Sequence, residues 1–312
     1  MGIDSSLGSP SCQPLSLSAG VIAQMKYFIL SMRPYQWTKN IVIFAAIIFS
    51  CNIFRWNMLV RVVSAFFLFC AYSGCIYIVN DLLDIESDQK HPRKSQRPIA
   101  SGKLTKPIAI WGAVVIGLSS FSIAWFMGGP FFLVALSYVL LQIAYSCKLK
   151  QMVILDVFSI AAGFVLRVIA GAEVIHVPIS SWLLICTMLL SLFLALSKRR
   201  HELIFLKGDA ATHRKILQEY SPYLLDQMIA VVTSATVLSY ALYTVAPETV
   251  QKFHTSRLIY TVPFVLYGIL RYLYLVHQKK EGGRPEELLV TDKPLLINIL
   301  LYGLVVVLIL YC

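Results

Sequence analysis

The sequence predicts an all-α, polytopic membrane protein with about nine transmembrane helices. Of its 312 residues, 58% are hydrophobic and only 14% are charged, which is more apolar side chain than one soluble core of this size buries. A spanning helix takes roughly 20 residues, so nine spans use about 180 and leave enough chain for the loops. The composition therefore excludes an ordinary soluble enzyme.

Long apolar runs define the expected elements in order. Residues 1–25, rich in Ser, Gly and Pro, are expected to be a disordered tail, followed by one membrane domain over residues 26–312. The first apolar run is short, and Pro34 to Lys39 are expected to form its interfacial first turn. The runs predict spans at residues 41–54, 58–80, 107–126, 130–146, 153–175, 179–197, 227–246, 258–277 and 294–311.

The positive charges fall mainly on one side of these predicted spans. With the N-terminus in the cytoplasm, 21 of the 27 Lys and Arg residues lie on the cytoplasmic side, and Arg167 and Arg271 lie inside spans. This bias predicts an integral inner or plasma membrane protein whose long polar loops, and therefore its polar site, face the cytoplasm. It also accounts for the net charge of +11 without nucleic acid as a partner.

An acidic motif begins at Asn80, directly after the second span. Asp81, Asp84 and Asp88 stand at i, i+3 and i+7, so on a continuous helix their carboxylates share one face. Mg²⁺ between them would relieve their repulsion, and this ion prefers one or two carboxylates together with phosphate oxygens of a substrate. The pattern favours a Mg²⁺ site at Asp81, Asp84 and Asp88, with a solvated juxtamembrane helix as the alternative.

A basic segment follows this acidic motif. Lys94 and Arg97 lie between Pro92 and Pro98, which stiffen the loop. Cations next to a metal-binding stripe suit an anionic diphosphate substrate, so Lys94 and Arg97 are expected to contact phosphate. The alternative is that these cations only set the membrane topology.

Asp156 and Arg167 are charged residues of the fifth predicted span. They are three helical turns apart and therefore share a face. Charge inside a membrane is costly and marks either a functional site or a buried pair. Both interpretations of Arg167 stay open here: an ion pair with another helix, or support for a polar cavity.

The motifs NDxxDxxxD at Asn80–Asp88 and HPxKxxRPIASG at His91–Gly102 resemble those of the UbiA superfamily of intramembrane prenyltransferases. The resemblance covers essentially the whole chain after residue 26. More closely, the chain is similar to the decaprenyl-phosphate phosphoribosyltransferase branch of that superfamily. Further matches to this branch are Arg33–Asn40, Tyr145–Asp156, Lys198–Leu203, Arg271–Tyr274 and Glu281–Glu286.

The resemblance implies a UbiA-like helical bundle and a Mg²⁺-dependent enzyme. By this resemblance, the enzyme would transfer 5-phosphoribosyl from 5-phosphoribosyl 1-diphosphate to a decaprenyl-type polyprenyl monophosphate in the bilayer. The implied catalytic residues are Asp81, Asp84 and Asp156, of which Asp156 would join the metal or orient a ribose hydroxyl. The implied substrate-binding residues are Lys39, Asn80, Lys94, Arg97, Tyr145, Lys150, Lys198, Arg199 and Glu202.

The segment after the sixth span separates the candidate functions. UbiA prenyltransferases usually carry a second aspartate-rich motif there, whereas this chain has Lys198, Arg199, Arg200 and Glu202. Lys and Arg suit the additional 5-phosphate of a phosphoribosyl donor, and Lys198 and Glu202 are at i, i+4 spacing on one face. A prenyltransferase with an aromatic acceptor is the alternative. A Mg²⁺ or lipid carrier is disfavoured because carriers place charge near the midplane of several spans.

Overall fold

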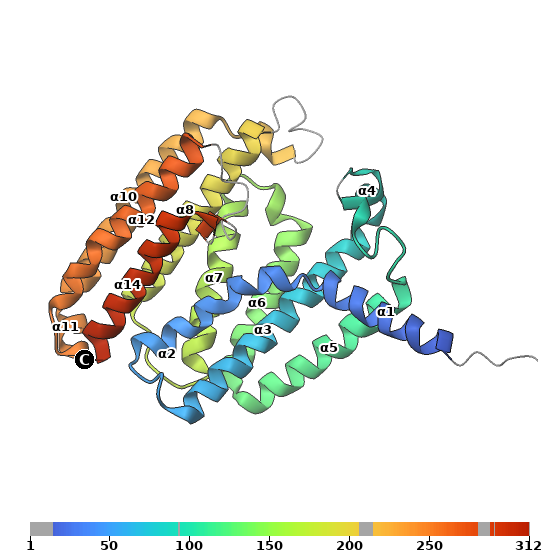
Figure 1. The fold of residues 1–312 in the computed structure, drawn as a ribbon, viewed down its shortest axis with the longest axis horizontal. Helices are drawn as coiled ribbons and strands as arrows, with labels where there is room; N and C mark the ends of the chain where they lie inside the picture. Colours follow the sequence, from blue (N-terminus) through green and yellow to red (C-terminus); the bar gives the residue numbers. More distant parts are fainter. Residues whose placement is uncertain (1–14, 93, 206–214, 280–287, 290, 312) are drawn as a thin grey trace, which may run out of the picture. The chain divides into compact units, whose positions relative to one another are not determined.

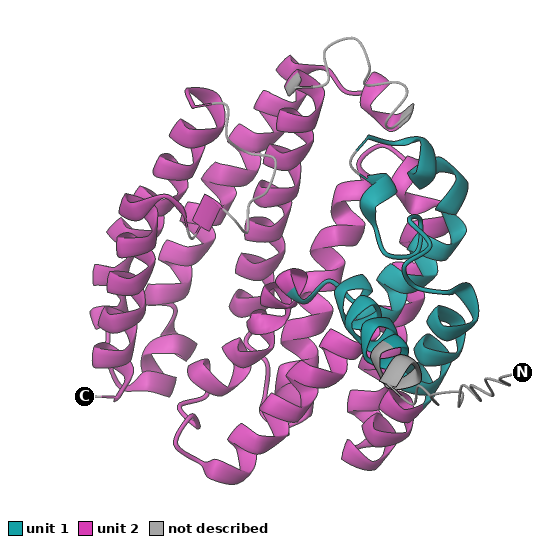
Figure 2. Ribbon diagram, turned by 45° about the vertical axis from the view of Figure 1, so that its right-hand side comes forward, with its two compact units in different colours: residues 1–34, 74–118 teal, residues 35–73, 119–312 magenta. Residues whose placement is uncertain are grey.

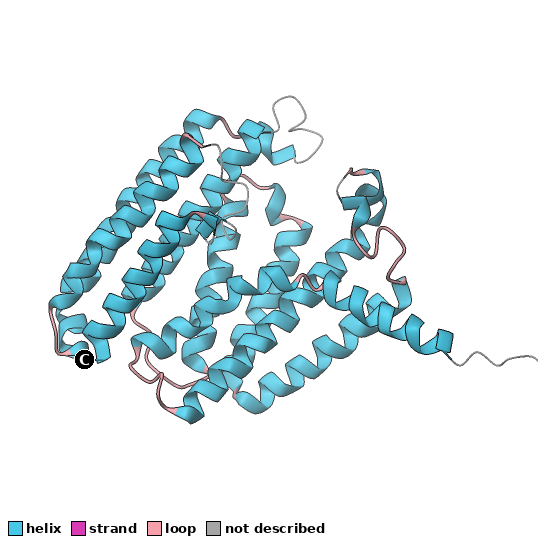
Figure 3. Ribbon diagram, viewed as in Figure 1, coloured by secondary structure: helices cyan, strands magenta, loops and turns pink. Residues whose placement is uncertain are grey.

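The computed structural model describes residues 15–92, 94–205, 215–279, 288–289 and 291–311. Within these ranges the chain folds into helices and loops without a strand (Figure 3). Eight helices are long and apolar enough to cross a membrane. This confirms the predicted all-α membrane class. A helix suits a bilayer because its backbone N–H and C=O groups bond to each other where no water is present.

Eight of the nine predicted spans correspond to helices of the structure (Figure 1). The predicted span 258–277 corresponds to the 3₁₀ helix η5 (Arg257–Thr261) followed by α12 (Val262–His277). The others are α3 (Trp56–Leu83), α5 (Lys106–Met127), α6 (Gly129–Cys147), α7 (Leu155–Glu173), α8 (Ser181–Phe205), α10 (Pro222–Val245) and α14 (Lys293–Tyr311). Short elements between them are α4 (Ile85–Lys90), η2 (Lys94–Gln96), η3 (Leu149–Gln151), η4 (Lys215–Gln218) and α11 (Pro247–Phe253).

The first predicted span, residues 41–54, is wrong as an uninterrupted helix. The chain instead forms α1 (Leu15–Ser31), the 3₁₀ helix η1 (Pro34–Phe44) and the short α2 (Ala45–Phe49). Helix α1 stops because Arg33 has a left-handed φ of 54° and Pro34 offers no backbone N–H.

Helix α1 also begins within the segment expected to be a tail. The boundary expected at residue 26 therefore falls inside a helix. Residues 1–14 of that segment lie outside the described residues.

The chain divides into two compact units (Figure 2). Unit 1 comprises residues 1–34 and 74–118, and unit 2 comprises residues 35–73 and 119–312. Within unit 1, the Phe28 ring of α1 packs on Gly112 of α5, and Met32 packs on Gly74 of α3. The Cys75 thiol also donates to the Ala113 carbonyl, at 3.5 Å, so α1, α3 and α5 form one packed group.

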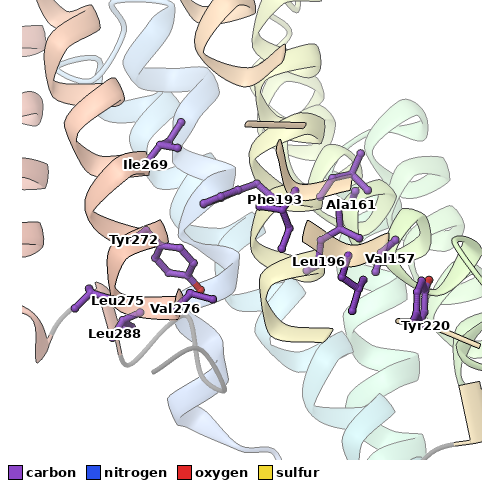
Figure 4. Close-up of a cluster of buried hydrophobic side chains, with 14 of the residues drawn as sticks. Val157, Ala161, Phe193, Leu196, Tyr220, Ile269, Tyr272, Leu275, Val276 and Leu288 are labelled. Atoms are coloured by element: carbon purple, nitrogen blue, oxygen red, sulfur yellow. The ribbon is translucent and has the colours of Figure 1, made fainter. Parts of the chain in front are cut away.

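The core of unit 2 lies along α8, which packs against α7 and α10. Val157 and Leu196 are buried there with Tyr272 of α12 (Figure 4). Leu225 of α10 belongs to the same cluster. Helix α12 in turn packs on α14. This packing fixes the ends of α7 and α8, which carry charged residues of the predicted site.

One close backbone approach holds α7 to the broken first span in unit 2. A Cβ atom at Gly171 would lie 2.1 Å from the carbonyl oxygen of Ile43, so only glycine fits. The residue therefore permits α7 to touch the backbone of η1.

We predict that Gly171→Ala destabilises the protein by about 1–3 kcal/mol, because the added methyl group must push η1 away. Gly117→Ala is the matched control, since a Cβ at Gly117 meets nothing within 4 Å. The measurement is the midpoint of thermal unfolding in detergent. Equal midpoints for the two variants would contradict the close approach.

Candidate active site

In unit 1, buried carboxylates and guanidinium groups form a network that we call the Asp81 cluster. It comprises Arg33, Asp81, Asp88, Lys94 and Arg97. Asp81 Oδ1 accepts from Arg33 Nη2 at 2.5 Å and from Arg97 Nη1 at 3.0 Å. Asp88 Oδ2 accepts from the same Arg97 nitrogen at 2.5 Å, and Lys94 Nζ lies 4.0 Å from Asp88 Oδ1. The cluster thus brings together four predicted site residues and Arg33.

The continuous helix that the acidic spacing predicts is interrupted at Asp84. Helix α3 ends at Leu83, α4 starts at Ile85, and Asp84 at the junction is exposed. Asp81 and Asp88 are buried and share Arg97, whereas Asp84 lies outside this network. The two helices still bring Asp81 and Asp88 together because the break is only one residue long.

The loop after α4 holds Arg97 in place. The side-chain amide of Gln89 donates to the Ala100 carbonyl at 3.2 Å, and the Leu104 amide donates to the Pro98 carbonyl at 2.9 Å. Gly102 closes the turn with a φ of 74°, a conformation that favours glycine. These bonds hold the loop segment that follows Arg97 against α4.

Two carboxylates of the Asp81 cluster can share one cation. A single nitrogen, Arg97 Nη1, lies within hydrogen-bonding distance of both Asp81 and Asp88. Their oxygens therefore converge on one point, and such a donor pair fits Mg²⁺ completed by substrate phosphate. No group of three His, Cys, Asp or Glu side chains able to share a metal ion occurs in the part of the chain that the structure describes.

Unit 2 contains a second network, which we call the Asp156 cluster. It comprises Tyr145, Asp156, Arg199, Glu202 and Tyr220. Arg199 Nε donates to Asp156 Oδ2 at 2.7 Å, its Nη1 donates to Glu202 Oε2 at 2.7 Å, and its Nη2 donates to Tyr145 at 3.3 Å. The side chains of Asp156 and Arg199 are 0% and 2% exposed, so this is a buried ion pair. Glu202 thus pairs with Arg199, at i, i+3.

Tyr220 is a member that sequence reasoning missed. Its hydroxyl donates to Asp156 Oδ1 at 2.9 Å and accepts the backbone N–H of Ile154 at 2.7 Å. Ile154 precedes α7 and has a φ of 68°, which is strained for a β-branched residue. Burial raises the pKa of Tyr220 to about 12, so the hydroxyl stays protonated and donates to the carboxylate at neutral pH.

Arg167 has neutral partners. Its Nε donates to Asn40 Oδ1 at 2.7 Å, its Nη1 to the Gly163 carbonyl at 2.9 Å, and its Nη2 to the Tyr138 hydroxyl at 2.8 Å. Its guanidinium also lies 4.7 Å from the centre of the Tyr138 ring. Of the two interpretations left open for Arg167, the ion pair with another helix is therefore wrong within the described residues. Arg167 instead joins η1, α6 and α7 inside unit 2.

The remaining predicted binding residues belong to neither of the two clusters. Lys39 is half-buried in η1, and Asn80 is half-buried near the end of α3. Lys150 and Lys198 are also half-buried, in η3 and near the end of α8, and neither forms an ion pair with another described residue. The ammonium groups of Lys150 and Lys198 can therefore meet an anionic ligand.

Other charged residues of unit 2 tie helices together. The Arg200 guanidinium binds Asp226 of α10, which also accepts from His277 of α12 at 3.2 Å. Arg271 Nη2 donates to Asp292 Oδ2 at 2.8 Å, and these hydrogen bonds hold the pKa of Asp292 below its ordinary value. Arg271, which the sequence places inside a span, thus connects α12 to the start of α14.

A set of helices long enough to span a membrane, with charged clusters at helix ends, defines the class as integral membrane proteins with candidate polar sites. The model of the UbiA prenyltransferase family matches residues 35–289. The chain belongs to this family, and it is a membrane-embedded transferase. This membership agrees with the resemblance seen in the motifs at Asn80–Asp88 and His91–Gly102.

Curated relatives cover most of the chain. It is 33% identical to the decaprenyl-phosphate phosphoribosyltransferase of Corynebacterium glutamicum, over 91% of this chain and 86% of that protein. It is 31% identical to the enzyme of the same name from Mycobacterium tuberculosis, over 90% of this chain and 91% of that protein. These names confirm the similarity to the phosphoribosyltransferase branch.

A solved structure shares the fold. A UbiA homologue from Archaeoglobus fulgidus, bound to DMAPP and Mg²⁺, superposes with a TM-score of 0.66 at 17% identity, over 91% of this chain and 96% of that chain. At this identity the likeness establishes the fold alone.

We predict that Tyr220→Phe lowers the stability by about 1–3 kcal/mol, because the Ile154 N–H loses its acceptor and Asp156 loses a donor. Tyr223→Phe is the control, since Tyr223 is 75% exposed. Thermal unfolding of both variants in detergent is the measurement. An unchanged midpoint for Tyr220→Phe would show that the hydroxyl is not part of the network.

Proposed function

We propose that this protein transfers 5-phosphoribosyl from 5-phosphoribosyl 1-diphosphate to a polyprenyl monophosphate of the decaprenyl type. The products are polyprenyl-phosphoryl 5-phosphoribose and diphosphate. The observation that carries the proposal is the arginine-centred Asp156 cluster at the end of α8, where Arg199 stands in place of a second aspartate-rich motif. Relatives named for this activity, 31–33% identical over about nine tenths of the chain, support it.

The Asp81 cluster is proposed to bind the diphosphate of the donor. Asp81 and Asp88 would hold Mg²⁺ directly, and the exposed Asp84 at the helix break would contact the ion through its bound water. When bound, Mg²⁺ neutralises charge on the leaving diphosphate. Lys94 and Arg97, which already lie next to these carboxylates, would contact the phosphate oxygens and orient the leaving group. Asn80 and Lys39 are proposed as further polar contacts.

Lys198 and Lys150 are proposed to bind the ribose 5-phosphate, because each presents an ammonium group that no described carboxylate neutralises. Asp156 has both oxygens occupied, by Arg199 and Tyr220. We therefore assign Asp156 as a positioning residue that orients Arg199, with Tyr145 and Glu202 as its other partners.

The reaction does not require a strong general base. The acceptor phosphate is largely ionised near neutral pH, since the second pKa of a phosphate monoester is about 6. One of its oxygens forms a bond to the ribose C1 while the bond from C1 to the diphosphate oxygen breaks. In-line attack on the α-configured donor gives a β-linked product. The cations next to the leaving group stabilise the charge that develops there.

We also propose that the N-terminus and both charged clusters face the cytoplasm. The distribution of Lys and Arg over the loops supports this orientation in the inner or plasma membrane. The phosphorylated donor is a soluble metabolite, so it would reach the protein from that side.

Transfer of a prenyl group from a prenyl diphosphate to an aromatic acceptor is the second candidate. The observation in its favour is the shared fold with the homologue that was solved with DMAPP and Mg²⁺. The basic end of α8 disfavours it, because a prenyl diphosphate lacks the separate 5-phosphate that Lys198 is proposed to bind.

The direct test uses purified protein in detergent with Mg²⁺, polyprenyl phosphate and donor labelled in the ribose. The proposal expects label in the lipid phase, lost when Mg²⁺ is chelated. Absence of labelled lipid with every polyprenyl phosphate would reject it.

We predict that Asp81→Asn and Asp84→Asn each lower turnover by at least about 100-fold, because each removes a carboxylate from the proposed Mg²⁺ site. Glu86→Gln is the control, since Glu86 is exposed on α4 and belongs to neither cluster. The measurement is label transfer at saturating substrate. Full activity of Asp84→Asn would remove Asp84 from the metal site.

We predict that Lys198→Ala raises KM for the donor by about tenfold, through loss of one charged contact. A donor analogue that lacks the 5-phosphate serves as the comparison. Its KM should be the same for the wild type and the variant. An equal loss with both donors would mean that Lys198 does not bind the 5-phosphate.

A further inference from the structure

An apolar groove of about 1020 Å³ lies between α1 and α5 of unit 1. Met25, Phe28 and Met32 line it from α1, and Ile108, Trp111 and Val115 line it from α5. Along α1, lining residues extend from Gly20 to Met32, a length of about 18 Å at 1.5 Å per residue. The groove is therefore elongated along α1, as a lipid chain requires.

The floor of this groove is fixed by packing. Phe28 rests on Gly112 so closely that a Cβ there would lie 2.3 Å from the ring. Several lining side chains nevertheless remain exposed, including Met25 at 61%, Trp111 at 68% and Val115 at 62%. These residues form an open apolar surface on both walls.

The two ends of the groove differ in charge. At one end the polar groups satisfy each other, because Gln24 donates to the Lys103 carbonyl and accepts from the Thr105 amide, at 2.9 and 3.2 Å. At the other end Met32 directly precedes Arg33, whose guanidinium binds Asp81. The Arg33 side chain is 19% exposed, so its guanidinium group can still meet an anion at this end of the groove.

Helix α3 connects this end of the groove to the cluster. Met32 packs on Gly74, and Arg33 pairs with Asp81, which lies seven residues further along α3 on the same face. Seven residues correspond to about 10 Å along the helix axis. A chain in the groove with a phosphate at its end can therefore reach Arg33.

We propose that this groove binds the isoprenoid tail of the polyprenyl phosphate, with the phosphate at Arg33. This inference rests on the proposed function. The apolar walls match the hydrocarbon tail, and the Arg33 guanidinium group at the end next to Met32 matches an anionic head group. The groove thereby selects long acceptors and presents their phosphate to the Asp81 cluster.

Val115→Trp tests the proposal by filling the groove. Val114→Trp is the matched control, because Val114 is 42% exposed on the same helix and does not line the groove. We expect Val115→Trp to raise KM for decaprenyl phosphate about tenfold. The tail of geranyl phosphate is too short to fill the groove. We therefore expect KM for geranyl phosphate, and KM for the donor, to change less than about twofold. Val114→Trp should resemble the wild type with all substrates.

Equal effects of both variants on decaprenyl phosphate would overturn the proposal. So would equal effects of Val115→Trp on the long and short acceptors. Crosslinking with a diazirine-tailed polyprenyl phosphate is a second measurement, made with and without excess phosphatidylcholine. Label on α1 and α5 that the excess lipid does not displace supports the proposal. Displacement of the label contradicts it. Absence of any transfer by the wild type would instead reject the proposed function.

Discussion

Pairing of buried charge is the constraint on which both clusters depend. A carboxylate or guanidinium removed from water is stable only if a partner of opposite charge and further hydrogen bonds replace the solvent. Asp81 and Asp88 meet this requirement through Arg33 and Arg97, and Asp156 meets it through Arg199. The same pairs gather the guanidinium groups that we propose to contact phosphate, so residues that stabilise the fold would also bind substrate.

Much of the fold could be predicted because membrane spans depend on local composition. Eight apolar runs correspond to helices, and their class follows from hydropathy alone. The first span failed because residues 41–54 are divided between the end of η1, the short α2 and a turn in which Cys51 has a φ of 57°. Hydropathy contains no information on such a break. The helix start at Leu15 was missed for a related reason, since Ser- and Gly-rich composition indicates disorder more often than a helix.

The sequence predicts which residues belong to the site, but it predicts few of the contacts between them. The motif residues Asp81, Asp88, Lys94 and Arg97 do lie together, because they are close in sequence. Partners from distant segments could not be deduced from spacing: Arg33 lies 48 residues before Asp81, and Tyr220 lies 64 residues after Asp156. Their contacts depend on tertiary packing. The roles assigned to Asp84, Lys198 and the other motif residues stay predictions until they are tested by substitution.

The central claim is that the charged clusters recognise a phosphoribosyl diphosphate and not a prenyl diphosphate. The most direct measurement is competition binding to the purified protein in Mg²⁺, with labelled 5-phosphoribosyl 1-diphosphate as the reporter. We expect saturable binding that geranyl diphosphate does not displace and that Lys198→Ala weakens. Displacement by geranyl diphosphate at similar concentration, or no binding of the reporter, would contradict it.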